Sequence, residues 1–250
     1  MYQFFITPEN IRENDIVVTS KQEVNHIRNV LRMKEGEKLA FCCPEKEKEY
    51  LCRITAMTAG EIYAAIEDIQ GNSRELPVEM TLFQGLPKGD KMEWIIQKAV
   101  ELGAVRIVPV ASKRAVVKLD AKKAVKKVQR WQEIARSAAK QSKRNLVPEV
   151  TPVMSFPEAV AYGKTLDMLV IPYEDARGIA HSREMLSQVK EKKSLGIYIG
   201  PEGGFQEEEV ELAATAGAHP LTLGHRILRT ETAGMALLSI LMFLLDTDEG

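Results

Sequence analysis

The chain has 250 residues and a formal net charge of −1, with 45% hydrophobic and 28% charged residues, values that are ordinary for a soluble globular protein. Its length suits one large domain or two modest ones, and its near-neutral charge means that a nucleic-acid partner must be met by a local basic patch. No signal peptide is expected, and the most apolar helix, Met235–Leu245, is too short to span a bilayer. Three cysteines without metal-ligand spacing predict a reducing, cytoplasmic location and no metal site.

The first seventy residues predict a small β-barrel with one inserted helix. Short strand-like segments lie at Tyr2–Ile6, Asp15–Val18, Lys38–Cys43, Glu49–Thr58 and Glu61–Asp68. The helix is expected over Lys21–Arg32, with Ser20 and Glu23 placed as a capping box. We therefore predict a first domain over residues 1–70, followed by a turn-rich linker over 71–77.

From residue 78 to 250 the pattern changes to alternating strands and helices. Strands are expected at Met80–Leu86, Val105–Val110, Met168–Ile171, Leu195–Ile199 and Pro220–Leu223. Helices are expected at Lys91–Leu102, Asp120–Arg144, Pro157–Tyr162, His181–Lys190, Gln206–Ala216 and Glu231–Leu245. This alternation predicts an α/β domain whose mostly parallel sheet is covered by helices on both faces.

The loop Gly200–Phe205, with the sequence GPEGGF, follows a predicted strand and precedes a helix. Such a turn often cradles phosphate, but here Glu202 and three further glutamates at the helix start would repel a polyphosphate. The spacing also differs from both nucleotide-binding glycine motifs. The loop favours a neutral or cationic ligand held by backbone groups; alternatively it is only a turn with a helix cap.

A second unusual loop, Leu223–Gly234, reads LGHRILRTETAG, and a third, Ile171–Asp175, reads IPYED. All three loops follow strands, where parallel sheets bind their ligands. The apolar pair Ile227 and Leu228 between two arginines predicts a pocket wall with a charged lip, and Thr230 is a candidate helix N-cap. The alternative for Arg229 is a surface ion pair.

The segment Asp120–Arg144 carries nine lysines and arginines against two acids, a local net charge of +7. Small and apolar residues recur along it at helical spacing, so one stripe is buried and the remainder is basic. In a neutral chain this segregation, with Arg28 and Arg32 on the N-terminal helix, indicates a nucleic-acid surface, although a solvated lysine face is the commoner explanation for such a run.

GPEGGF followed by LGHRILRTETA closely resembles the ribosomal-RNA uridine-N3 methyltransferases of the RsmE family, which belong to the SPOUT class of S-adenosylmethionine-dependent enzymes. The resemblance extends over nearly the whole chain through HIRNVLRMKEGE, KMEWIIQKAVELG, IVPVASKRAV and QSKR. One departure is Lys140, where the family usually has Glu. The resemblance implies a PUA-like N-terminal barrel, a SPOUT-type sheet with a C-terminal trefoil knot, and a homodimer with active sites at the subunit interface.

The resemblance also implies which residues serve the reaction. The cofactor would be S-adenosylmethionine, whose sulfonium suits an acidic, phosphate-free loop, and the knot loops that bind it correspond to Pro172, Glu174, Gly200, Glu202, Gly203, Leu223, Gly224, Ile227, Leu228 and Thr232. Arg229 is the candidate for stabilising the uracil anion, which makes it the predicted catalytic residue. The predicted RNA contacts are Arg28, Arg32, Arg114 and Arg144.

The implied substrate is 16S rRNA within the small ribosomal subunit. Three other functions are weighed against this one. A non-catalytic RNA-binding assembly factor would have no reason to keep a cofactor pocket. A SPOUT methyltransferase acting on another RNA position would share every motif named above. A nucleotide-using α/β protein is disfavoured by the absence of a phosphate loop.

Overall fold

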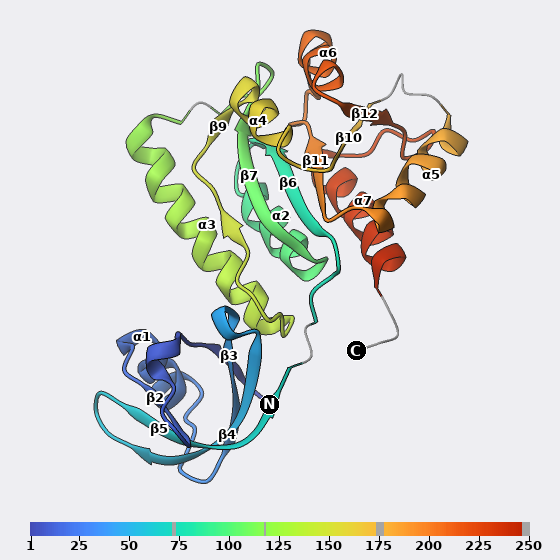
Figure 1. Cartoon of the computed structure of the whole chain (residues 1–250). Helices are drawn as coiled ribbons and strands as arrows, with labels where there is room; N and C mark the ends of the chain where they lie inside the picture. The colour runs from blue at the N-terminus through green and yellow to red at the C-terminus, as the bar shows by residue number, and fades with distance from the viewer. Residues whose placement is uncertain (72–73, 118, 174–177, 247–250) are drawn as a thin grey trace. The chain divides into compact units, whose positions relative to one another are not determined.

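The computed structural model describes residues 1–71, 74–117, 119–173 and 178–246, and it divides into two compact units. Of the described residues, one unit contains Met1–Glu75 together with Ala139–Leu146, and the other contains Leu76–Ala138 together with residues 147–246 (Figure 1). Along the described residues, no helix has the length and apolar character needed to cross a membrane.

The N-terminal unit is a curled five-stranded sheet in the order β1-β3-β4-β5-β2. Its strands are β1 (Gln3–Phe5), β2 (Asp15–Val18), β3 (Lys38–Cys43), β4 (Lys48–Met57) and β5 (Ile62–Gln70). Strands β1 and β3 are parallel, and the other pairs are antiparallel. Helix α1 (Lys21–Asn25) continues as a π-helical turn, His26–Val30, and its Val24 and Ile27 join the core inside the sheet.

Two local features of this unit differ from the sequence prediction. Ser20 is the N-cap residue of α1 by position, but its side chain makes no capping hydrogen bond. Glu23 is instead buried, and its carboxylate accepts hydrogen bonds of 2.6 and 2.9 Å from Nζ of Lys140. The capping-box prediction is therefore wrong, because a long-range ion pair takes the carboxylate that the local motif would need.

The C-terminal unit is built on a parallel sheet in the order β12-β10-β11-β6-β7-β8. Its strands are β6 (Glu79–Gly85), β7 (Ala104–Ala111), β8 (Glu149–Val150), β10 (Met168–Pro172), β11 (Ser194–Ile199) and β12 (Ala218–Leu221), and the short β9 (Met154–Ser155) also pairs with β7. Every described strand pair in this sheet is parallel. The predicted α/β architecture is confirmed.

Helices cover both faces of this sheet, and their bounds are α2 (Lys91–Glu101), α3 (Ala121–Gln141), α4 (Phe156–Gly163), α5 (Ile179–Ser187), α6 (Glu207–Thr215) and α7 (Thr230–Leu245). Apolar residues of α4 and α6 pack with Phe83 and Tyr198 in one core cluster. Successive strand residues point to opposite faces, so Gln84 and Ile199 face the other way, toward α7, which lies beside α2 (Figure 1).

Candidate functional site

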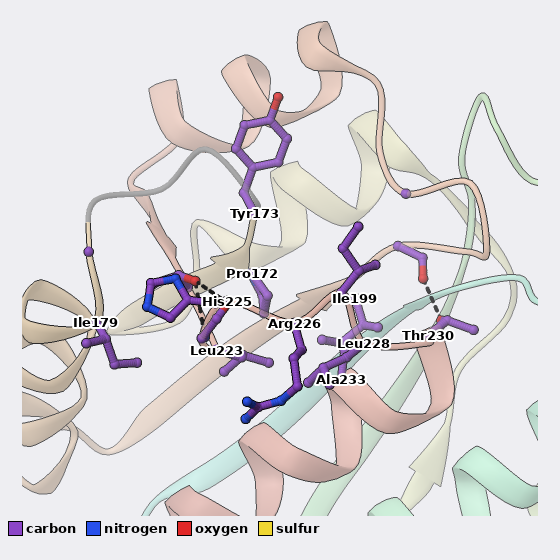
Figure 2. A pocket seen from close by; sticks show the side chains of 16 residues that line it. Pro172, Tyr173, Ile179, Ile199, Leu223, His225, Arg226, Leu228, Thr230 and Ala233 are labelled. Carbon is purple, nitrogen blue, oxygen red and sulfur yellow. Dashed lines mark hydrogen bonds between the residues drawn. The ribbon is translucent and has the colours of Figure 1, made fainter.

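A cavity of about 520 Å³ lies where β10, β11 and β12 end. The three loops singled out in the sequence meet there, because the carboxyl ends of neighbouring parallel strands share one edge of the sheet. Figure 2 shows the side chains that line it. The lining residues are Pro172, Tyr173, Gly178, Ile179, Ile199, Gly200, Gly204, Thr222, Leu223, Gly224, His225, Arg226, Ile227, Leu228, Thr230 and Ala233.

The cavity has apolar walls and several backbone segments without side chains. Gly204 and Gly224 adopt left-handed φ angles of 68° and 116°, which glycine reaches without strain. At Gly200 the need for glycine is steric, since a Cβ there would lie 2.9 Å from the carbonyl carbon of Gly204. The backbone of the GPEGGF loop therefore packs tightly on itself.

The predicted cofactor residues fall into two groups in the structure. Those that line the cavity are Pro172, Gly200, Leu223, Gly224, Ile227 and Leu228. Three others, Glu202, Gly203 and Thr232, belong to the same loops or to the first turn of α7 but are not among the lining residues. Glu174 lies outside the described residues.

The acidic side chain of the GPEGGF loop is bonded to the first residue of α2 and to the segment just before it. Glu202 accepts hydrogen bonds from the backbone N–H of Lys88 at 3.1 Å and from Nζ of Lys91 at 2.9 Å. Burial raises the pKa of Glu202, but the bonds from Lys91 and from backbone N–H groups outweigh it and lower the pKa below its ordinary value of 4.5. Nζ of Lys91 also lies 3.6 Å from Oε2 of Glu231. This loop's negative charge is thus compensated locally.

Two of the glutamates that open α6, Glu208 and Glu209, are bonded to residues outside the cavity. Glu209 is buried, and it accepts hydrogen bonds from the backbone N–H groups of Lys113 and Gln206, each at 2.9 Å. Glu208 pairs with Nζ of Lys113 at 3.7 Å. They cap the helix and fasten the loop after β7, as the alternative interpretation of this loop expected.

The second loop ends at α7, one residue earlier than predicted. Arg229 is the N-cap residue and is exposed, and Thr230 is the first residue of the helix. The hydroxyl of Thr230 is not a helix cap: it donates a 2.6 Å hydrogen bond to the carbonyl oxygen of Gly200, drawn dashed in Figure 2. The N-cap prediction for Thr230 is wrong because its hydroxyl bonds across to another loop.

Among the described residues, Arg226 is the arginine that lines the cavity. The predicted catalytic Arg229 follows the lining residue Leu228 in the sequence but is not itself a lining residue. His225 also lines the cavity. Sequence reasoning passed over Gly178 and Ile179, which come from the start of α5 and carry no motif. Ile199, which precedes the GPEGGF loop, and Ala233, within the LGHRILRTETAG loop, also line the cavity, although neither was predicted to bind the cofactor.

The four predicted RNA-binding arginines have different environments. Arg32 is exposed, with a left-handed φ of 54°, and Arg28 donates a hydrogen bond to the carbonyl of Thr58. Arg114 is exposed and donates a 3.0 Å bond from Nη1 to the carbonyl of Gly203, at the edge of the GPEGGF loop.

Arg144 does not fit an RNA-binding role. Only 4% of it is exposed, and its guanidinium donates to the carboxylate of Glu75 within the N-terminal unit. Burial of the guanidinium removes it from the surface, so the expectation that Arg144 contacts RNA is corrected. Its neighbour Lys140 is also structural, since it pairs with Glu23 and lies over the ring of Phe4.

The basic helix α3 matches its predicted pattern closely. Trp131, Ala135 and Ala138 are buried, while Lys122, Lys126 and other basic residues of its N-terminal half are exposed.

The thiols of the N-terminal unit belong to its core: burial raises the pKa of Cys42 to about 11 and that of Cys52 to about 12. No metal-binding group of His, Cys, Asp and Glu occurs within the described ranges.

Comparisons with known proteins agree with this architecture. The family model described as an RNA methyltransferase domain matches residues 74–242, and the one described as an RNA methyltransferase PUA domain matches residues 19–67. The chain is 40% identical over 248 residues to ribosomal RNA small subunit methyltransferase E of Bacillus subtilis, covering 97% of this chain and 96% of that protein.

Two solved structures are similar along their whole length. One is ribosomal RNA small subunit methyltransferase E of Neisseria gonorrhoeae bound to S-adenosyl methionine, with 34% identity, a TM-score of 0.83 and 98% of each chain covered. The other is a putative methyltransferase of Legionella pneumophila with bound S-adenosyl methionine, at 31% identity, a TM-score of 0.85 and 97% of each chain covered. The predicted fold class, a SPOUT-type sheet with a PUA-like domain, is confirmed, and its trefoil knot stays a prediction.

Proposed function

The chain belongs to the ribosomal RNA small subunit methyltransferase E family, and on that premise we propose that it transfers the methyl group of S-adenosylmethionine to N3 of a uridine in 16S rRNA. The observation that carries the proposal is the 520 Å³ cavity formed by the three family-like loops at the carboxyl ends of β10, β11 and β12. A chain that only bound RNA would have no use for such a cavity.

The lining fits S-adenosylmethionine in size and chemistry. Ligand pockets of a few hundred Å³ with apolar walls and a few polar groups are usual for molecules of this size. Leu223, Ile227 and Leu228 supply apolar surface, and Gly200 and Gly224 contribute backbone without side chains to the cavity wall. The remaining predicted contacts, Glu174, Glu202, Gly203 and Thr232, would complete the site; Glu202 would act there already paired with Lys91.

S-adenosylmethionine supplies a methyl group activated by its sulfonium. The part of the chain is to hold the uracil ring in line with that methyl group and to stabilise the anion left when N3 loses its proton. Arg229 is suited to this role, because it is exposed immediately beside the cavity wall at Leu228 and its guanidinium is always charged.

The RNA-binding residues proposed here are the exposed basic side chains of α3 and Arg114 in the C-terminal unit, and Arg28 and Arg32 in the N-terminal unit. These side chains would bind phosphates without reading sequence. Replacing Lys122 and Lys126 by Gln should weaken RNA binding and reduce the slope of log affinity against log salt by about 0.7–0.9 per lost contact. Cofactor affinity should not change, and Lys164→Gln, another exposed lysine at the end of α4, is the matched control.

The assembly that we propose is a homodimer. Phe243 and Ile240 on α7 are 82% and 43% exposed, and Trp94 on the neighbouring α2 is 40% exposed, which gives an apolar surface that a second copy would cover. Sedimentation equilibrium on the wild type and on Phe243→Glu tests this assignment. The assembled small subunit as substrate, the cytoplasm as location and the trefoil knot complete the proposal.

The decisive experiment incubates the purified chain with labelled S-adenosylmethionine and unmodified small ribosomal subunits, followed by nucleoside analysis. Labelled N3-methyluridine is the expected result. Label on another nucleoside would refute the uridine assignment. Absence of label with the cofactor still binding would point to another RNA or another assembly state as the substrate. Absence of cofactor binding would favour the non-catalytic assembly factor.

Arg229→Ala tests the catalytic assignment. Loss of a group that stabilises a developing anion costs about 100- to 1,000-fold in kcat. The affinity for S-adenosylhomocysteine, measured by calorimetry, should stay at the wild-type value. A variant with full turnover would show that Arg229 has no such role.

A further inference from the structure

Gln84, at the end of β6, lies outside the cavity yet is bonded to its wall. Its side chain is fully buried and faces α7. Its Nε2 donates two hydrogen bonds of 2.9 Å, one to the carbonyl of Gly85 and one to the hydroxyl of Thr230. That hydroxyl donates in turn to the carbonyl of Gly200 at 2.6 Å. The three residues form a chain of hydrogen bonds, named here the Gln84 relay.

The direction of the relay follows from the chemistry of its groups. The Gly200 carbonyl can only accept, so the single proton of the Thr230 hydroxyl is committed to it. The hydroxyl must then accept from Gln84, which requires the NH₂ group of the amide on that side. The Gly85 carbonyl imposes the same orientation. The amide is therefore held in one of its two orientations by two independent acceptors.

The relay ties together two walls of the cavity that are distant in sequence. Gly200 begins the GPEGGF loop, and Thr230 ends the LGHRILR loop; both are lining residues. Behind them the main chains are in close contact, since a Cβ on Gly85 would lie 2.6 Å from the backbone nitrogen of Pro201. The hydrogen bonds therefore set how far apart the two loops stand.

The other end of the Gln84 amide supports a role beyond packing. Oε1 of Gln84 is buried and has no hydrogen-bond partner among the described residues. Burying an acceptor without a partner costs free energy, which an apolar side chain of similar size would avoid. The amide is kept here for the two bonds that its NH₂ group donates.

We propose that Gln84 is a positioning residue for the cofactor pocket, acting through Thr230 to hold the Gly200 carbonyl and the start of the GPEGGF loop in the binding geometry. The inference rests on the proposed function, in which this cavity takes S-adenosylmethionine. A loop held in its bound conformation before the ligand arrives loses less entropy on binding, so the relay acts on cofactor affinity.

The test measures S-adenosylhomocysteine binding by calorimetry and methyl-transfer kinetics for Gln84→Met and Gln84→Glu. Met removes the donor at similar length, and Glu replaces the donor by an acceptor. For both we expect Kd for S-adenosylhomocysteine and KM for S-adenosylmethionine to rise about tenfold, with kcat at saturating cofactor within about threefold of the wild type. A purely structural role would lower the melting temperature and the fraction of active protein but leave Kd unchanged.

Variants of Thr230 give an independent test, which remains valid even if the Gln84 variants fail to fold. Thr230→Val should lose affinity as Gln84→Met does, and Thr230→Ser, which keeps the hydroxyl, should bind more tightly than Thr230→Val. Because both changes break one relay, the double variant should be no weaker than either single variant. Additive losses, or full affinity in Thr230→Val, would overturn the proposal.

Gly234→Ala is the matched control beside the relay. Its new Cβ would lie 3.9 Å from Oε1 of Gln84, an ordinary contact that leaves the hydrogen bonds intact, so Kd should not change. The wild type separates the two hypotheses. If it binds no S-adenosylhomocysteine, the proposed function fails; if it binds and Gln84→Met binds equally well, only the relay hypothesis fails.

Discussion

Replacing Gly85 by Ala would test how closely the loops behind the cavity are packed. The added Cβ would lie 2.6 Å from both Cδ and the backbone nitrogen of Pro201 and 3.0 Å from the carbonyl carbon of Gly200. Carbon atoms in contact stand about 3.5–4.0 Å apart, so the two chains must separate by roughly 1 Å. Neither can yield easily, because Pro201 is a buried ring and Gly200 is bonded to Thr230.

Overpacking of a dense interior costs about 1–3 kcal/mol, and clashes with backbone atoms place Gly85→Ala near the upper value. For a unit of this size each kcal/mol lowers the melting temperature by about 2–4 °C, so the loss should be roughly 6–12 °C. Differential scanning calorimetry measures it on the transition of the C-terminal unit. S-adenosylhomocysteine affinity should fall as well, because the displaced segment begins the cavity wall.

Gly234→Ala is the control for this experiment too. Its Cβ would meet Cγ1 of Ile199 at 3.7 Å, an ordinary contact, and Ala is favoured over Gly within a helix by about 0.5–1 kcal/mol. It should therefore melt at or slightly above the wild-type temperature. If Gly85→Ala also melted with the wild type, the close approach of β6 to the GPEGGF loop would not contribute to stability, and this reasoning would be refuted.

Three further predictions concern buried or paired charges. Arg144→Met should destabilise the N-terminal unit by about 3–5 kcal/mol in urea unfolding, because it removes the guanidinium that compensates the charge of the mostly buried Glu75, while RNA affinity of the folded protein stays unchanged. Lys140→Glu should destabilise the same unit through repulsion with Glu23, and reversing both charges together should recover most of the loss in melting temperature. The lowered pKa of Glu202 means that its ionised form stabilises the fold above pH 4.5 and that this contribution is lost as pH falls below that value. In Glu202→Gln the acid-induced loss of stability should therefore be smaller than in the wild type. Equal acid unfolding curves for the two proteins would contradict the pairing of Glu202 with Lys91.

Local patterns predicted most of the elements. The bounds of β2 and β3 agree with the prediction to the residue, and the strand-loop-helix order predicted that three loops would meet at one edge of the sheet. β12 begins and ends two residues earlier than expected, because Ala218 and His219 already pair with β10. The two-residue strands β8 and β9 are too short to give a periodic signal.

The errors share one physical origin. The side chains of Glu23, Arg144 and Thr230 were interpreted through their sequence neighbours, yet their partners lie between 30 and 117 residues away. Gln84 was missed for the same reason, since a lone polar residue at the end of an apolar strand gives no sign that a hydroxyl 146 positions later will accept its proton. Long-range polar pairing follows from the fold and could not be found before it.

The composition of the N-terminal unit has a consequence for how the chain is made. Its sheet is complete by Gln70, but the unit also needs residues 139–146, which provide Lys140 for Glu23, a main-chain carbonyl for Gln3 and another for the thiol of Cys42. During synthesis these contacts wait until about seventy more residues have emerged, several seconds at the usual rates of elongation. The first unit to begin folding is therefore not finished until the second is partly made, and a fragment ending at the linker would lack the segment that supplies these contacts.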